Sequence, residues 1–129
     1  MVKLVENTID PASVYNSICS AFSGSVVFHY AVVKKQAGTD KATQSIEYRA
    51  QGGSVLEMES IAGELEQRWK LEDVLLIRRT GCLAVGDIIS LVAASSPNSE
   101  DAFEACRQGI SCLKKMVTIR KTEKFAEIS

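Results

Sequence analysis

The sequence predicts an α+β fold in which about three helices pack against a mixed, largely antiparallel sheet. Segments rich in β-branched and aromatic residues alternate with three segments whose apolar residues repeat every three or four positions. Several strand-like segments follow one another across short turns, which favours antiparallel pairing. A chain of 129 residues, 46% of them hydrophobic and 24% charged, suits one domain over residues 1–129.

The N-terminal part predicts a strand, a helix and two further strands. Asp10 before Pro11 is typical of a helix start, because an N-cap acceptor precedes proline at the first helical position. Val14, Ile18 and Ala21, at three-to-four spacing, form one apolar face, and Gly24 can end the helix. The expected elements are a strand over 2–7, a helix over 11–22, a strand over 24–33, an exposed polar loop over 34–43 and a strand over 44–50.

The middle of the chain predicts a helix followed by two strands. A helix is expected over 55–69, after the glycine break, with an apolar stripe of Val55, Met58, Ile61, Leu65 and Trp69. A strand over 72–81 and a tight connection over 84–87 follow. The segment IISLVAASS, residues 88–96, is continuously apolar and is therefore expected at the centre of the sheet.

The C-terminal part predicts a third helix over 97–116 and a last strand over 117–125. Asn98 or Ser99 can cap the helix, and acidic residues in its first turn complement the helix dipole. Its expected apolar stripe is Ala102, Phe103, Cys106, Ile110 and Leu113.

Charge and composition exclude several classes of function. A net charge of −1 gives no overall field that would favour nucleic acid or an anionic membrane. The apolar runs are too short to span a bilayer, and the N-terminal residues lack the pattern of a signal peptide, so the cytoplasm is the expected location. Because the four cysteines (Cys19, Cys82, Cys106 and Cys112) form no CxxC pair and histidine occurs once, we expect reduced thiols and no metal site.

The C-terminal stretch SCLKKMVTIRKTEKF gathers positive charge around a short apolar segment. Lys114 and Lys115 fall in the last turn of the third predicted helix, where cations complement the helix dipole, so a structural role is sufficient to explain them. Alternatively, Lys114 and Lys121 point into one pocket, where two ammonium groups can hold a phosphate or stabilise charge that develops on a carbonyl. The residue types alone leave both interpretations open.

Other charged or titratable residues lie at strand ends or inside a strand. Arg78 and Arg79 are adjacent, so at most one of them can face a given pocket. Lys34 and Lys35 end the second predicted strand with the same alternation. His29 lies inside that strand, and because no partner is readable nearby, we expect a packed or edge residue rather than a catalyst.

From Gly24 to Glu123, a series of ordered motifs resembles the large, catalytic subunit of molybdopterin synthase. GSVVFHYAVVKK is similar to the first core strand of that family, which ends in a basic residue, and IEYRA is similar to its LEYEAY strand. ELEQRW resembles the close of the family's second helix. IRRTGCLAVGD resembles IHRxGxLxxGE, and VAASSPNSEDAFEACRQGISCLKKMVTIRKTE resembles VxSxHRxxAFEAxxxxIDxLKxxxPIWKKE.

The resemblance implies an enzyme of molybdenum cofactor biosynthesis, a sulfurtransferase without a cofactor of its own. In the family, the large subunit forms a homodimer, and each end binds a small ubiquitin-like sulfur-carrier subunit. The C-terminal Gly-Gly tail of the small subunit, carried as a thiocarboxylate, enters a pocket of the large subunit. Sulfur then passes twice to cyclic pyranopterin monophosphate to form the molybdopterin dithiolene. By resemblance, these are the expected partners and reaction of the present chain.

The resemblance also implies a set of site residues. Lys114 matches the helix-end lysine of the family's pocket and Lys121 matches a lysine of PIWKKE, so both are expected to be catalytic. Lys115 is expected to be a solvated neighbour. The expected substrate-binding residues are Lys34, where the family usually has arginine, and Arg78, Arg79, Asn98, Ser99, Arg120 and Glu123.

Three positions depart from the family pattern. The His-Arg pair before the third helix is Asn98-Ser99 here, the HR after the fourth strand is Arg78-Arg79, and PIW has become Thr118-Ile119-Arg120. Arg120 or Arg78 can replace the lost charge, but nothing obvious in the sequence replaces the histidine. Two alternatives therefore accompany the enzyme: a non-catalytic paralogue that keeps the dimer and the partner-binding groove, and an unrelated small α+β ligand-binding domain.

Overall fold

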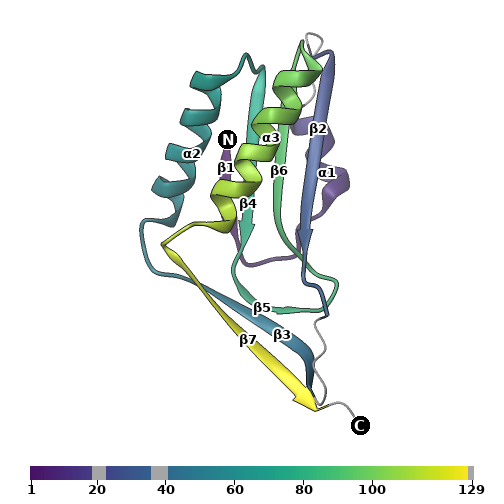
Figure 1. Cartoon of the computed structure of the whole chain (residues 1–129), viewed down its shortest axis with the longest axis vertical. Coiled ribbons are helices and arrows are strands. Elements are labelled where there is room, and N and C mark those ends of the chain that lie inside the picture. The colour runs from purple at the N-terminus through teal and green to yellow at the C-terminus, as the bar shows by residue number, and fades with distance from the viewer. Residues whose placement is uncertain (19–22, 36–40, 128–129) are drawn as a thin grey trace.

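The computed structural model describes residues 1–18, 23–35 and 41–127, and its elements are labelled in Figure 1. Within these ranges the chain forms, in order, β1 (Val2–Val5), α1 (Pro11–Ile18), β2 (Ser25–Val32), β3 (Lys41–Ala50), α2 (Ser54–Arg68), β4 (Asp73–Arg79), β5 (Gly81–Ala84), β6 (Ile88–Ser96), α3 (Ser99–Lys114) and β7 (Ile119–Glu127).

The strands form two sheets. The larger one has the order β1-β4-β6-β2, in which β1 pairs with β4 in parallel and the other pairs are antiparallel. The smaller one has the order β5-β3-β7 and is antiparallel throughout. In Figure 1 the smaller sheet lies below the larger one, at the end where α3 gives way to β7.

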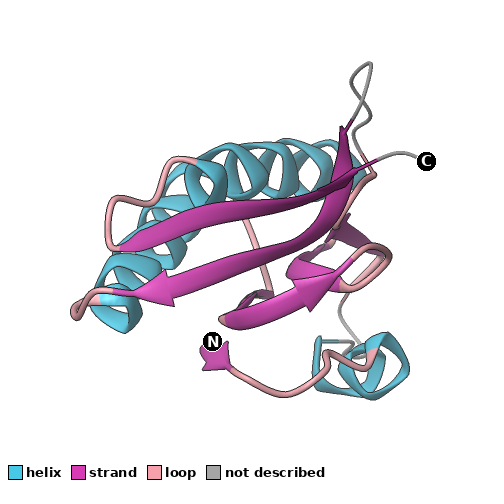
Figure 2. Cartoon of the chain, turned by 90° about the horizontal axis from the view of Figure 1, so that it is seen from below, coloured by secondary structure: helices cyan, strands magenta, loops and turns pink. Residues whose placement is uncertain are grey.

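Helices cover both faces of the larger sheet, with α2 and α3 on one side and α1 on the other (Figure 2). Successive strand residues point to opposite faces, so β4 contributes to two cores. Val74 and Leu76 pack in the cluster that holds α2 and α3, whereas Leu75 and Ile77 pack with Val14 of α1. The central strands, β4 and β6, are therefore buried along most of their length, because both of their faces pack against other elements.

The predicted α+β class, with helices against a largely antiparallel arrangement of strands, is confirmed. The central position of the apolar segment is confirmed as well, because β6 lies between β4 and β2. Asn98 caps α3: its side-chain oxygen accepts hydrogen bonds from the backbone N–H groups of Glu100, at 2.9 Å, and Asp101, at 3.4 Å. The cap leaves Ser99 as the first residue of the helix.

Three expectations about the strands were wrong. The sheet is divided in two, β5 forms an additional strand, and β3 begins at Lys41, inside the expected loop over 34–43. The four residues of β5 are too few for a periodic pattern and bury one side chain, Leu83. Lys41 joins β3 because the opposite strand, β7, extends to Glu127 and pairs with it. The second half of the first predicted helix, residues 19–22, lies outside the described residues.

The predicted apolar stripes of the two long helices were partly wrong. Val55 is 43% exposed and Phe103 is 60% exposed. The packing face of α3 consists instead of small or medium residues, centred on Gly109. A Cβ atom at this glycine would lie 2.9 Å from Cγ1 of Val92 on β6. This close approach of helix to sheet selects the face that is buried and turns Phe103 toward solvent.

Candidate functional site

A cavity of about 620 Å³ lies where the end of α3 meets the two sheets. Its walls come from the last turn of α3 and from residues on or next to β2, β3, β4, β6 and β7. The polar side chains that line it are His29, Lys34, Tyr48, Arg78, Ser90, Lys114 and Lys121. The cavity therefore brings together four cationic residues and one histidine that are widely separated in the sequence.

Arg78 forms the buried wall of the cavity, with 8% of its surface exposed. Its Nη1 donates a hydrogen bond to the carbonyl oxygen of Leu113, at 3.2 Å, and its guanidinium carbon lies 4.7 Å from the ring centroid of Tyr48. Its Nε is buried without a hydrogen-bond partner, and no carboxylate within the described residues pairs with it. Burial lowers the pKa of Arg78, but a guanidinium stays charged at neutral pH.

Tyr48 supplies a protonated phenol beside this arginine. Burial raises the pKa of Tyr48; the charge of Arg78 opposes that shift, and Glu123 adds to it. The hydroxyl group is therefore neutral at physiological pH and can donate a hydrogen bond. Tyr48 also lies opposite Lys121 in the pairing of β3 with β7, so the small sheet presents both side chains to the cavity.

Lys34, Lys114 and Lys121 reach the cavity from three different elements. Lys114 ends α3, Lys121 lies on β7, and Lys34 follows β2. All three are exposed, and none of them makes an ion pair with a described carboxylate. The neighbouring lysines, Lys35 and Lys115, do not line the cavity.

His29 also lines the cavity, although its position inside β2 predicted a packed or edge residue. The strand is indeed at the edge of the larger sheet. Its register against β6 shifts between Ala31 and Val32. The shift skips Ile89, so the extra residue belongs to β6. Lys34 lies beyond the end of β2, where strand alternation no longer applies, and it lines the cavity together with His29. A regular alternation in the sequence would have placed them on opposite sides.

The imidazole ring of His29 makes no hydrogen bond within the described part of the chain, and its Nδ1 is buried. Burial lowers the pKa of His29, and the charge of Lys114 lowers it further. The imidazole is therefore neutral at physiological pH. The one feature of the sequence that singles out His29 as a candidate site residue is that the chain has no other histidine.

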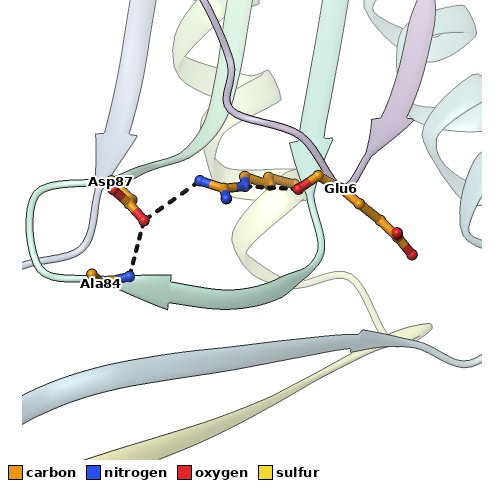
Figure 3. Close-up of polar contacts among 4 residues, drawn as sticks. Glu6, Ala84 and Asp87 are labelled. Atoms are coloured by element: carbon orange, nitrogen blue, oxygen red, sulfur yellow. Dashed lines mark hydrogen bonds and ion pairs between the residues drawn. The ribbon is translucent and has the colours of Figure 1, made fainter.

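Arg79, one of the expected substrate-binding residues, does not line the cavity. Its Nε donates to the carbonyl oxygen of Glu6, at 3.1 Å, and its Nη1 lies 3.5 Å from Oδ2 of Asp87. The same carboxylate oxygen accepts from the backbone N–H of Ala84, at 3.0 Å (Figure 3). Arg79 thus ties β4 to the loop after β1 and to the turn before β6, as the alternation with Arg78 predicts.

Arg120 and Glu123 lie on β7 but do not line the cavity either. Arg120 is exposed and lies opposite Arg49 in the pairing of β7 with β3, and Lys121 beside it faces the cavity. Glu123 accepts a hydrogen bond from Oγ1 of Thr43, at 2.6 Å. Its charge still reaches Tyr48, whose pKa it raises.

Asn98 and Ser99 are separated from the cavity by the full length of α3. This helix has 16 residues and is about 24 Å long at the usual rise per residue. Within one chain, the two residues that replace the family's His-Arg pair therefore lie at the opposite end of α3 from Lys114. The side chain of Asn98 is engaged in capping the helix.

Glu57 positions the start of β7, a role that the sequence did not indicate. Its carboxylate accepts hydrogen bonds from Oγ1 of Thr118, at 2.6 Å, from the backbone N–H of Thr118, at 3.2 Å, and from that of Val117, at 3.1 Å. Although burial acts to raise it, the pKa of Glu57 is lowered by these three hydrogen bonds. The first turn of α2 therefore fixes the segment that leads to Lys121.

A second cavity, of about 330 Å³, lies between β1, α1 and β4, and Lys3 and Asp10 are its charged lining residues. None of the expected site residues lines it. The cavity at the end of α3 has the more distinctive chemistry, because four cations and no described carboxylate line it. Such an arrangement stabilises an anion in a partly dry site.

No group of three or more histidine, cysteine, aspartate or glutamate side chains within the described ranges is placed to hold a metal ion. Among the helices of those ranges, none has the length and apolar character that a bilayer crossing requires.

Comparisons with known proteins agree on one family. The model of the MoaE protein family matches residues 4–116. Molybdopterin synthase catalytic subunits are similar to the chain: that of Bacillus subtilis is 25% identical over 94% of this chain and 77% of its own length. That of Pyrococcus abyssi is 30% identical over 82% and 72%, and that of Nostoc sp. strain PCC 7120 is 35% identical over 81% and 64%.

Solved structures of the same kind share the fold. The X-ray structure of molybdopterin synthase from Staphylococcus aureus superposes with a TM-score of 0.88 at 26% identity, and the match covers 95% of this chain and 90% of that one. A MoaE protein from Burkholderia ambifaria superposes with a TM-score of 0.82 at 21% identity, over 98% and 88% of the two chains.

Proposed function

The chain belongs to the MoaE protein family, and we propose that it is the large, catalytic subunit of a molybdopterin synthase. It acts in molybdenum cofactor biosynthesis by transferring sulfur from the C-terminal thiocarboxylate of a small ubiquitin-like subunit to cyclic pyranopterin monophosphate. The product is the molybdopterin dithiolene. The family match over residues 4–116 supports one large-subunit-like domain over residues 1–129, and the same relationship supports assembly as a homodimer with two small subunits.

The observation that carries this proposal is the unpaired charge of Arg78. A guanidinium that is 8% exposed, with a free Nε and no described carboxylate partner, is costly unless an anion completes it. Both reactants supply anions, a thiocarboxylate from the tail and a phosphate from the precursor. Arg78 is suited to a planar carboxylate-like group, because its donors form a rigid fork.

The lysines around Arg78 supply the remaining charge. Lys114 and Lys121 are assigned the catalytic role, in which they stabilise negative charge that develops on the acyl oxygen and sulfur during transfer. Lys34 is assigned to the phosphate of the precursor, because it lines the cavity as an exposed, flexible point charge. Arg79, Arg120, Glu123, Asn98 and Ser99 are not assigned direct contacts with the substrate inside the cavity of one chain.

The cytoplasm is the proposed location. Cys82, Cys106 and Cys112 are all free thiols in the described structure, which suits a reducing compartment.

Reconstitution tests the proposal. The chain is mixed with the thiocarboxylated small subunit and cyclic pyranopterin monophosphate, and the dithiolene product is measured together with the loss of sulfur from the small subunit. Product formation is expected, and Lys114→Ala is expected to abolish it. Binding of the small subunit without any product, while a large subunit of established activity succeeds in the same mixture, would instead identify a non-catalytic paralogue.

A further inference from the structure

His29 is a titratable group of the cavity to which the proposed function assigns no role. It lines the cavity from β2, together with Lys34, Tyr48, Arg78 and Lys114. Nδ1 is its buried ring nitrogen, and neither nitrogen has a hydrogen-bond partner in the described structure. Nε2 therefore remains available to a water molecule or ligand. A purely structural histidine would be expected to bond a neighbouring backbone or side-chain group.

We propose that His29 is the proton acceptor of the site, with Nε2 taking a proton from the water molecule that releases sulfur from the tail of the small subunit. The inference rests on the proposed function. Sulfur that moves from the acyl carbon of the tail to a carbon of the precursor is bonded to both during the transfer. This acyl–sulfur bond must then be broken, and water is the reactant available in an open cavity.

The atoms balance in the following way. The water oxygen bonds to the acyl carbon, one water proton moves to Nε2 of His29, and the carbon–sulfur bond breaks. The electron pair of that bond leaves with sulfur as a thiolate on the precursor. The tail is left as a carboxylic acid, which loses its proton to solvent, and His29 returns its own proton to solvent. No oxidant or reductant is needed.

The surroundings of His29 fit this role. Lys114 of α3, Arg78 of β4, Lys121 of β7 and Lys34 after β2 are cations that disfavour an imidazolium, and Tyr48 is a neutral phenol. As a base at Nε2, the neutral ring carries its single hydrogen on Nδ1. The surrounding positive charge keeps the imidazole neutral, which a proton acceptor requires. The cations that stabilise the developing thiolate thus also keep His29 in the neutral form that accepts a proton.

The test compares His29→Gln and His29→Phe with the parent protein. Single-turnover mixtures with thiocarboxylated small subunit and cyclic pyranopterin monophosphate are followed by mass spectrometry of the small subunit, which detects the covalent tail–precursor adduct. We expect both variants to bind the small subunit as the parent does, to accumulate the adduct, and to form product about 100-fold more slowly, as is typical when a general base is lost. The acid-side fall of the parent's pH–rate profile should disappear in both variants.

Each outcome separates the two proposals. A parent protein that makes no product overturns the proposed function and the role of His29 with it. An active parent whose His29 variants make product at the same rate, without adduct, overturns the role of His29 alone. Lys115→Gln is the matched control, because this exposed residue does not line the cavity, and thermal melting of every variant checks the fold. Loss of small-subunit binding in both folded His29 variants also contradicts the proposal, since it would make His29 a docking residue.

Discussion

The guanidinium of Arg78 lies over the ring of Tyr48, 4.7 Å from its centroid, at the inner wall of a cavity that both sheets help to form. The two residues come from different sheets, β4 and β3. Their contact therefore couples the position of the small sheet to the charge of the cavity. The aromatic ring covers the face of the guanidinium, and at its edge Nη1 donates to the carbonyl oxygen of Leu113 while Nε has no partner.

Replacement of Arg78 should lower activity without lowering thermal stability. In Arg78→Met, we expect sulfur transfer and binding of the small subunit's tail to fall at least about tenfold, because a buried charge-assisted contact is lost. The melting temperature should stay the same or rise, since an apolar side chain of similar length no longer buries an unpaired charge. Reconstituted turnover and thermal melting measure the two effects. A marked drop in melting temperature with full activity would show that Arg78 is structural.

Lys121 on β7 and Lys115, which directly follows α3, should differ sharply in their contribution to the rate of sulfur transfer. Lys121→Ala is expected to reduce the rate of sulfur transfer at least about 100-fold, because Lys121 lines the cavity where charge develops. Lys115→Ala should change the rate less than about twofold, since an exposed lysine outside the cavity contributes little. Turnover assays of the two variants, run in parallel, measure both rates. Equal losses in Lys121→Ala and Lys115→Ala would contradict the assignment of Lys121.

The hydrogen bonds of Glu57 predict a pH-dependent contribution to stability. Because the folded-state pKa of Glu57 is lowered, its contribution is present above the ordinary carboxyl pKa and is lost as the pH falls through the folded-state pKa. At pH 7 we expect Glu57→Gln to lower the melting temperature by about 2–5 °C. The difference should shrink as the pH falls below the ordinary carboxyl pKa and on through the lower folded-state pKa of Glu57. Melting curves across this range measure it, and Glu59→Gln, an exposed neighbour on α2, is the control.

The titration of His29 can be observed directly, because it is the only histidine in the chain. Proton NMR of its ring should give a pKa below the ordinary value of 6.5, because the ring is buried and Lys114 is nearby. Lys114→Gln should raise this pKa part of the way back, since burial is the larger cause and remains. Lys115→Gln should leave it unchanged. A His29 that titrates at or above its ordinary pKa in the parent protein would contradict the described surroundings.

The sequence predicted the residues that converge but not all of the geometry that brings them together. Lys34, Lys114 and Lys121 could be named from their resemblance to family motifs, and they do line one cavity. The alternation of a strand correctly allowed only one of Arg78 and Arg79 to face it. The same alternation, applied to Lys121, turns Arg120 away.

What escaped prediction depends on contacts between distant segments. His29 and Lys34 line the same cavity because β2 ends at Val32, before Lys34, and a single sequence does not show where the alternation of a strand stops. Glu57 binds the start of β7, which is far away along the chain. Phe103 fitted a helical stripe as well as its neighbours did, but the close approach at Gly109 decided which stripe was buried.

The pairing of β3 with β7 also bears on how the protein folds. Tyr48 and Lys121 are neighbours across the small sheet, yet two strands of the larger sheet, β4 and β6, and two helices lie between them in the chain. Closing so long a loop is entropically slow, whereas the contacts among α2, β4, β6 and α3 join segments that are nearer in the chain. We therefore expect a folding transition state in which the large core is formed and β7 is not yet docked. In such a state the core would already be stable while the cavity did not exist, so the capacity to bind a partner's tail would be the last property the chain acquires.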